Sequence, residues 1–243
     1  MTTIADNLQR VHERIALACA AAHREPSEVT LLAVSKTFGP EAIREAAAAG
    51  QIAFGENYIQ EAVEKIAMLH PLRLQWHCIG PIQSNKTRLV AAHFDWAHSV
   101  DRLKTAQRLS EQRPAGMAPL QVCIQVNIDG GPTKAGVAPR EVLPLAQEVA
   151  RLPHIALRGL MTIPEPASDF ADQKAIHLRA KALFDQLRDA GLALDTLSMG
   201  MTGDLEAAIA AGSTMVRVGT AIFGTRPVNE DPSSASPAAM TKP

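Results

Sequence analysis

Apolar positions along the chain follow two alternating patterns, short continuous runs and longer stripes with a helical period. The run Val29-Thr30-Leu31-Leu32-Ala33-Val34-Ser35 is too short for a helix and rich in β-forming residues, which predicts a strand buried on both faces. Near the N-terminus, apolar residues recur at steps of three and four, which predicts an amphipathic helix. This stripe consists of Ile4, Leu8, Val11, Ile15 and Ala18.

The same alternation continues to the end of the apolar sequence. Strand candidates begin near Thr30, Ile52, Leu74, Phe94, Leu120, Ala156, Leu194 and Met215. Helical patterns lie between them at 40–50, 56–67, 84–92, 102–112, 140–151, 171–190 and 204–211. Eight strands spaced by about 26 residues predict an α/β protein, a single (β/α)8 TIM-like barrel with an extra N-terminal helix. A doubly wound open sheet is the alternative, because alternation alone does not show that the sheet closes.

The C-terminal segment differs from the rest of the chain in composition. Residues 228–243 hold three prolines and three serines but almost no large apolar side chain. Such a segment buries too little surface to offset the entropy of ordering it, so we expect a disordered tail. The domain prediction is therefore one barrel domain over 1–227 and a disordered tail over 228–243.

Composition excludes several classes of function. Hydrophobic residues make up 47% of the chain and the net charge is −1, which predicts a packed globule without attraction to nucleic acid or an anionic membrane. The longest uncharged stretch, 114–128, contains prolines and amides and does not resemble a membrane span. The N-terminus is interrupted by charges, so it has no signal-peptide core.

Cysteine and histidine spacing gives no sign of a metal site. Cys19, Cys78 and Cys123 are odd in number and form no CxxC pair, which favours a reducing cytoplasm over a disulfide framework. The eight histidines show no HxH or HExxH spacing. We expect His77 and His98 to be hydrogen-bonded structural residues.

The candidate chemistry lies at the ends of the strands, where barrels carry their sites. Lys36 follows the apolar run Leu31–Val34, and partial removal from water favours its neutral amine. A neutral amine is the nucleophile that forms a Schiff base with an aldehyde. The alternative is a strand-end lysine with its stem on apolar surface and its head in water.

Two loops after the seventh and eighth strands suit an anion. They read 198–203 and 219–224, and both combine glycines with hydroxyl groups, as in Ser198, Thr202, Gly219 and Thr220. Small residues let backbone N–H groups approach a phosphate, and barrels often bind phosphate here. Thr202 is also a candidate N-cap of a helix over 203–211. Because Asp204 and Glu206 would repel a phosphate, the loop at Gly219 is the better anion site.

Arg217 interrupts the eighth strand and shares a face with Met215 and Gly219. A buried charge there is costly unless it is paired, so the alternative to a ligand role is an ion pair with a neighbouring strand. Asn57 adds a polar group after the second strand. A reactive lysine facing an anion site suits a phosphorylated aldehyde.

Several motifs in order resemble the pyridoxal phosphate homeostasis protein family over roughly residues 4–226. They are Ala33-Val34-Ser35-Lys36-Thr37, Phe54-Gly55-Glu56-Asn57-Tyr58, the segment 76–86, Gly159-Leu160-Met161, the segment 197–202 and the segment 216–224. The resemblance implies a fold similar to the barrel domain of alanine racemase. It also implies a cytoplasmic, monomeric binder of pyridoxal 5′-phosphate (PLP) that maintains vitamin B6 balance, with no catalytic residue and transient contacts with PLP-dependent apoenzymes.

The resemblance also implies a role for each candidate residue. PLP would be held as a Schiff base on Lys36, with Asn57 beside it and Arg217 facing the pyridine nitrogen. Its phosphate would be held by Ser198, Thr202, Gly219 and Thr220. Lys134 matches a family lysine proposed to accept cofactor, and a solvated loop lysine is the alternative.

Two other functions remain open from the sequence, a PLP-dependent amino-acid racemase of the alanine racemase fold type and a cofactor-free Schiff-base aldolase. A racemase needs a second base opposite the lysine, yet Tyr58 is the only tyrosine and no second domain is predicted. An arginine at the ring nitrogen would leave that nitrogen unprotonated, and the cofactor ring would then withdraw electrons less well than such catalysis needs. Both features favour a non-catalytic carrier.

Overall fold

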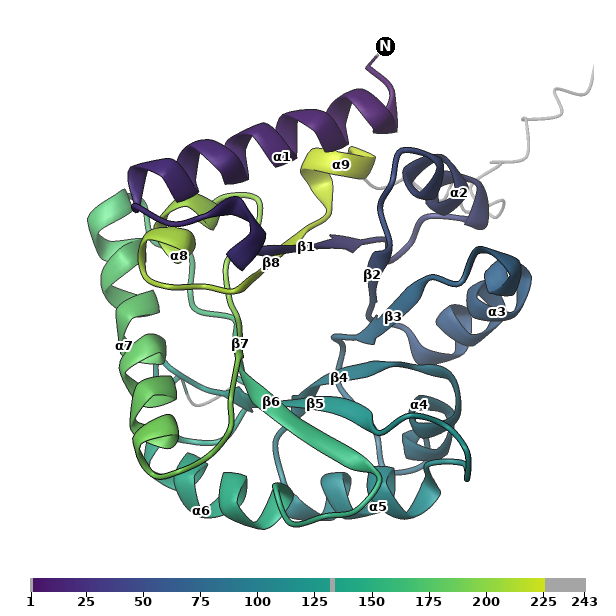
Figure 1. Cartoon of the computed structure of the whole chain (residues 1–243), viewed down its shortest axis with the longest axis vertical. Helices are drawn as coiled ribbons and strands as arrows, with labels where there is room; N and C mark the ends of the chain where they lie inside the picture. The colour runs from purple at the N-terminus through teal and green to yellow at the C-terminus, as the bar shows by residue number, and fades with distance from the viewer. Residues whose placement is uncertain (1, 132–133, 226–243) are drawn as a thin grey trace, which may run out of the picture.

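The computed structural model describes residues 2–131 and 134–225, and in them the strands form one closed parallel barrel. Each strand pairs with its neighbours in chain order, and the first strand also pairs with the last, with Leu32 opposite Arg217. This closure confirms the predicted barrel and excludes the open doubly wound sheet. Figure 1 shows the strands at the centre and the helices around them.

The strands are β1 (Thr30–Val34), β2 (Ala53–Glu56), β3 (Gln75–Cys78), β4 (Trp96–Val100), β5 (Leu120–Val126), β6 (Ile155–Thr162), β7 (Thr196–Ser198) and β8 (Met215–Val218). The α-helices are α1 (Ile4–Ala21), α2 (Pro40–Ala48), α3 (Ile59–Leu69), α4 (Thr87–His93), α5 (Leu103–Gln112), α6 (Pro139–Val149), α7 (Phe170–Asp189), α8 (Leu205–Ala210) and α9 (Thr220–Phe223). Two short 3₁₀ turns, η1 (Pro26–Glu28) and η2 (His70–Leu72), precede β1 and β3.

The predicted extra helix is α1. It starts at a capping box in which Thr3 and Asp6 each accept a hydrogen bond from the other's backbone N–H. Its apolar stripe, including Leu8, Val11 and Ile15, is buried. Figure 1 shows α1 lying across α8 and α9, beside the junction of β8 and β1. The helix therefore covers the seam at which the barrel closes.

The predicted start of the helix after β2 was three residues early. Helix α3 begins at Ile59, and Glu56 belongs to β2. The side chain of Glu56 is fully buried and hydrogen-bonded, which keeps this residue in the strand. Helix α9 was not predicted, because a single turn carries no periodic pattern.

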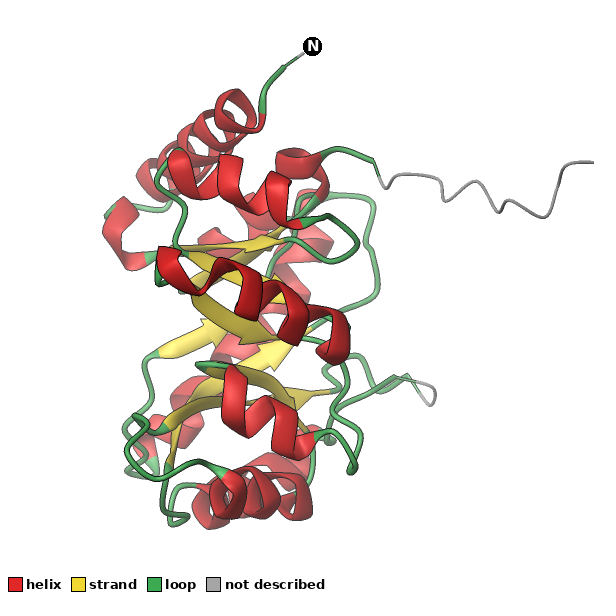
Figure 2. Cartoon of the chain, turned by 90° about the vertical axis from the view of Figure 1, so that its right-hand side faces the viewer, coloured by secondary structure: helices red, strands yellow, loops and turns green. Residues whose placement is uncertain are grey.

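The side view in Figure 2 shows the strands enclosed by helices, and the core lies both outside and inside the barrel. Between strands and helices lies a large apolar cluster. Inside the barrel lies a second, smaller apolar cluster that includes Leu32 and Met215, and the interior also holds buried polar side chains. These lumen groups are His77, His98, Ser198 and Arg217. The barrel interior thus carries several buried polar side chains near the C-terminal ends of its strands.

Within the described residues, no helix has the length and apolar character needed to cross a membrane. The same part of the chain contains no group of three or more His, Cys, Asp or Glu side chains suited to a metal ion. The predicted disordered tail, 228–243, lies outside the described residues.

Candidate functional site

A hollow of about 330 Å³ opens at the C-terminal ends of the strands. It is lined by Val34, Lys36, Asn57, Ile79, Ile163, Met201, Thr202, Gly203, Arg217, Gly219 and Thr220. Six of the seven residues predicted from the sequence are therefore brought together, and the seventh, Ser198, lies outside the lining. The volume is at the lower end of the range for small-molecule sites, and the position is the one that barrels use.

Lys36 follows β1 and stands beside a strained residue. Thr37 has a φ of 69°, in the left-handed region that a β-branched residue adopts only at a cost. The Oγ1 atom of Thr37 is also buried and has no hydrogen-bond partner among the described residues. Strain and an unsatisfied polar atom next to the candidate lysine are typical of a functional site.

A buried polar cluster fixes the ends of β1 and β2. Ser35 donates a hydrogen bond of 2.6 Å to Glu56, and the ammonium of Lys65, on α3, lies 3.0 Å from the same Oε1 atom. Burial raises the pKa of Glu56, against the lowering effect of Lys65 and Ser35. Since Lys36 and Asn57 directly follow Ser35 and Glu56, the cluster holds both residues in place at the pocket.

Asn57 is further held by a close approach of the chain after β3. A Cβ atom built on Gly80 would lie 2.7 Å from the Cα atom of Asn57, well inside van der Waals contact. Only glycine therefore leaves room for Asn57 to keep its position at the pocket wall.

Arg217 is 4% exposed and is held entirely by neutral acceptors. Its guanidinium donates to the carbonyl and the hydroxyl of Ser198, each at 2.8 Å, and to the carbonyl of Thr162 at 2.8 Å. Burial lowers the pKa of Arg217 to about 10, so the group stays protonated at neutral pH. The alternative of an ion pair with a neighbouring strand is wrong, because no such pair occurs among the described residues.

Part of the pocket wall offers donors to an anion. Thr202 and Gly203 come from the turn before α8, and Gly219 and Thr220 come from the start of α9. The first N–H groups of a helix have no acceptor within it, so they are free to bind a ligand. A Cβ atom on Gly219 would lie 3.1 Å from the carbonyl oxygen of Val34, so glycine suits this crowded position.

The acids expected to repel a phosphate have other partners. Asp204 accepts hydrogen bonds from His177 Nε2 at 2.9 Å and from the Met201 N–H at 2.6 Å. Burial alone would raise the pKa of Asp204, but these hydrogen bonds, together with charge interactions with His177 and Arg217, outweigh it and lower the pKa. Glu206 pairs with Arg14 at 2.8 Å. The predicted N-cap role of Thr202 is wrong, because α8 begins at Leu205 with Asp204 at its N-cap.

Ser198 and Lys134 lie outside the lining of the pocket. Ser198 is fully buried, and its hydroxyl accepts a hydrogen bond from the guanidinium of Arg217. Lys134 forms ion pairs with Asp129 at 2.9 Å and with Glu165 at 3.1 Å. Although burial acts against it, the hydrogen bonds to these two acids raise the pKa of Lys134 and keep its ammonium protonated.

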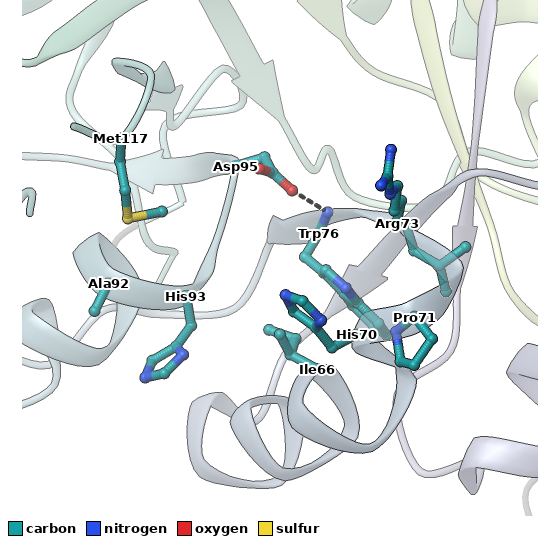
Figure 3. A pocket seen from close by; sticks show the side chains of 10 residues that line it. Ile66, His70, Pro71, Arg73, Trp76, Ala92, His93, Asp95 and Met117 are labelled. Atoms are coloured by element: carbon teal, nitrogen blue, oxygen red, sulfur yellow. Dashed lines mark hydrogen bonds between the residues drawn. The ribbon is translucent and has the colours of Figure 1, made fainter.

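A larger hollow, of about 700 Å³, lies at the opposite end of the barrel (Figure 3). It is bounded by residues that precede or begin β3 and β4, such as His70, Arg73 and Asp95. Figure 3 shows Asp95 accepting a hydrogen bond from the Trp76 N–H, at 2.8 Å. No residue predicted for the site lies there, and this end of a barrel serves stability rather than chemistry.

Sequence reasoning missed the apolar walls of the pocket, which are Val34, Ile79, Ile163 and Met201. Each ends a strand or follows one closely, so the rule that located Lys36 applies to them as well. They were missed because only polar strand ends were considered. The Glu56–Lys65 pair was also missed. Its only sign in the sequence is that Glu56, a charged residue, follows a short apolar run.

The comparisons with known proteins agree on one group of relatives. A family model described as the alanine racemase N-terminal domain matches residues 6–227. A pyridoxal phosphate homeostasis protein of Pseudomonas aeruginosa is 59% identical over 226 residues, covering 93% of this chain and 97% of that protein. The structure of PipY of Synechococcus elongatus, with PLP bound, has a TM-score of 0.77 at 40% identity and covers 86% of this chain and 100% of its own. An alanine racemase of Clostridium difficile, at 16% identity, a TM-score of 0.70 and coverage of 90% of this chain and 57% of its own, shares the fold alone.

Proposed function

The chain belongs to the pyridoxal phosphate homeostasis protein family, and we propose from this and from the pocket that it binds PLP and maintains intracellular vitamin B6 balance. One observation carries the proposal. The pocket at the C-terminal end of the barrel is lined by a lysine and by an arginine whose hydrogen-bond acceptors are all neutral, with no carboxylate among its lining residues. Such a lining suits an anionic aldehyde.

The residues of the pocket fit the separate parts of PLP. Lys36 would hold the ligand covalently as a Schiff base, because its amine can condense with the aldehyde with loss of water. Thr202, Gly219 and Thr220 would offer hydroxyls and backbone N–H groups to the phosphate. Ser198 does not line the pocket and instead accepts a hydrogen bond from Arg217. Arg217 would donate a hydrogen bond to the ring nitrogen, and Asn57 would lie beside the ring. PLP itself supplies a reactive aldehyde and an electron-withdrawing ring.

We propose a carrier rather than an enzyme with turnover. The positive charge of Arg217 disfavours a proton on the ring nitrogen in a desolvated site, which weakens the ring as an electron sink. Tyr58, the only tyrosine of the chain, is 52% exposed and does not line the pocket. Both observations support storage and transfer over racemisation.

The test compares the absorbance of wild-type protein with that of Lys36→Ala and Lys134→Ala. Purified wild-type protein loaded with PLP should absorb visible light and release a B6 vitamer on denaturation. Lys36→Ala should lose this absorbance, whereas Lys134→Ala, which removes an ion-paired lysine outside the pocket, should keep it. A colourless wild-type protein after loading would contradict the proposal. Amino-acid racemisation above the rate of free PLP would favour the racemase alternative.

The proposal also covers the cellular compartment and the oligomeric state of the protein. Its cysteines, Cys19, Cys78 and Cys123, are buried and unpaired, which supports a reducing cytoplasm. We infer a monomer that contacts PLP-dependent apoenzymes transiently, as the family resemblance implies. Light scattering of the purified protein, alone and mixed with an apoenzyme, tests both statements.

A further inference from the structure

A chain of hydrogen bonds crosses the barrel lumen and ends on the arginine of the pocket. Gln75 Oε1 lies 3.0 Å from His77 Nε2, and His77 Nδ1 lies 2.9 Å from His98 Nε2. His98 Nδ1 then lies 3.1 Å from Ser198 Oγ, which is 2.8 Å from the guanidinium of Arg217. The contact between His98 and Ser198 joins β4 to β7 across the interior of the barrel.

The two ends of this chain determine its direction. The guanidinium of Arg217 can only donate, and the amide oxygen of Gln75 can only accept. His77 must therefore carry its proton on Nε2 and accept at Nδ1, which requires His98 to carry its own proton on Nε2. The hydroxyl of Ser198 then donates to His98 Nδ1 and accepts from Arg217. Every link of the chain is satisfied, with both imidazoles neutral.

Burial keeps the two histidines neutral. It lowers the pKa of His77 to about 3, and burial, with smaller contributions from the neighbouring His77 and the charge of Arg217, lowers the pKa of His98 well below its usual value. The ring of Trp96 stacks on His77 with centroids 5.2 Å apart and an interplanar angle of 7°, which fixes the imidazole in its plane. The chain is therefore rigid and uncharged at neutral pH.

An uncharged chain of hydrogen bonds orients the guanidinium of Arg217 without neutralising its charge. Buried polar groups are costly compared with apolar side chains of the same size, so a barrel lumen gains nothing in stability from two histidines. A carboxylate in their place would orient the guanidinium but neutralise it. A serine that passes its own proton to a histidine becomes a stronger acceptor, because linked hydrogen bonds polarise one another. The guanidinium is thus held firmly and keeps its charge.

We propose that His98, supported by His77, is a positioning residue for the cofactor, which orients Arg217 toward the ring nitrogen through Ser198. The inference rests on the proposed binding of PLP. It adds that the geometry of the arginine is set from the lumen, by side chains that do not line the pocket.

The experiment measures the affinity for PLP and the ¹⁵N chemical shift of its ring nitrogen in ¹⁵N-labelled PLP. His98→Leu breaks the chain and should weaken binding about tenfold and move the ring-nitrogen shift. His98→Asn places an acceptor near the former Nδ1 position and should restore both. Ser198→Ala should resemble His98→Leu. Ser110→Ala, which removes another buried serine hydroxyl on α5, should leave both measurements at their wild-type values.

The outcomes separate the inference from the proposed function. Wild-type protein that does not bind PLP contradicts the function. Wild-type protein that binds PLP, with His98→Leu and Ser198→Ala unchanged in affinity and ring-nitrogen shift, overturns the inference. If His98→Leu does not fold, the inference is tested by Ser198→Ala and by the tautomers of His77 and His98 in wild-type protein. NMR should find both imidazoles neutral, with the proton on Nε2. A protonated His98, or one with its proton on Nδ1, would overturn the inference.

Discussion

Arg217 has almost no contact with water, yet its three hydrogen-bond acceptors carry no charge. A buried charge is tolerated only when polar partners replace its hydration, and here two carbonyls and a hydroxyl do so. These partners fix the guanidinium without cancelling its charge. The pocket therefore presents a positive group of defined direction to its ligand.

Arg217→Met tests this role with a side chain of similar length and no charge. The loss of a charged hydrogen bond to the cofactor should lower its affinity by about 1.5–3 kcal/mol, roughly 10- to 150-fold. Equilibrium dialysis with PLP measures the change. Arg151→Met, which removes an exposed arginine paired with Glu148 on the outside of the barrel, should keep wild-type affinity. Unchanged affinity in Arg217→Met would leave Arg217 as a structural residue only.

The candidate site was largely predictable at this scale, because Lys36, Asn57 and Arg217 are polar residues in or after apolar strands. Their partners were not predictable. The acceptors of Arg217 lie on β6 and β7, and only the closed barrel brings them to β8. The left-handed backbone of Thr37 was also missed, since nothing in its residue type favours that conformation.

Among the elements, α3 is attached to the ends of β1 and β2 by one buried ammonium. Lys65 is 4% exposed and contacts Glu56, the carbonyl of Ser35 and, at 2.6 Å, Glu61. The Oε2 atom of Glu56 has no hydrogen-bond partner among the described residues. Lys65 is therefore the main group that compensates the buried acid.

Lys65→Met should destabilise the protein by about 3 kcal/mol at neutral pH, because it leaves an uncompensated buried carboxylate. Urea unfolding measures the loss, and the double variant Glu56→Gln/Lys65→Met should recover part of it. The control is Lys181→Met on α7, whose partly exposed pair with Asp185 should contribute less than about 1 kcal/mol. Equal losses in the two single variants would contradict this account of α3.

Element positions followed from the sequence more closely than element boundaries. Every predicted strand start lies within two residues of the observed one, since each strand is an apolar run between polar segments. The start of α3 was misplaced because hydrophobic periodicity does not show that the carboxylate of Glu56 is buried. Closure of the barrel also had no sequence signal, because it depends on the pairing of β1 with β8.

For the whole molecule, the polar lumen links folding to pH. The folded-state pKa of His77 is about 3 and that of His98 lies well below 6.5, whereas both titrate near 6.5 in the unfolded chain. Below pH 6.5 the unfolded state therefore binds more protons than the folded state. Stability should fall as the pH falls from 6.5 toward 3, by up to about 1.4 kcal/mol per pH unit for each histidine.

Urea unfolding at pH values between 7 and 4.5 tests this linkage. The stability of His77→Gln should depend less steeply on pH than that of wild-type protein, by about one bound proton. His12→Gln, which changes an exposed histidine on α1, should keep the wild-type slope. A wild-type slope in His77→Gln would show that His77 is protonated in the folded state as readily as in the unfolded chain.

The central claim is that Lys36 holds PLP in the pocket at the C-terminal end of the barrel. Reduction of PLP-loaded protein with borohydride, followed by proteolysis and mass spectrometry of the peptides, tests it most directly, because reduction makes the attachment permanent. We predict a pyridoxyl group on Lys36 as the predominant modification, and unmodified Lys134, whose ammonium is held by Asp129 and Glu165. Predominant labelling of Lys134 or Lys86, with Lys36 unmodified, would contradict the account.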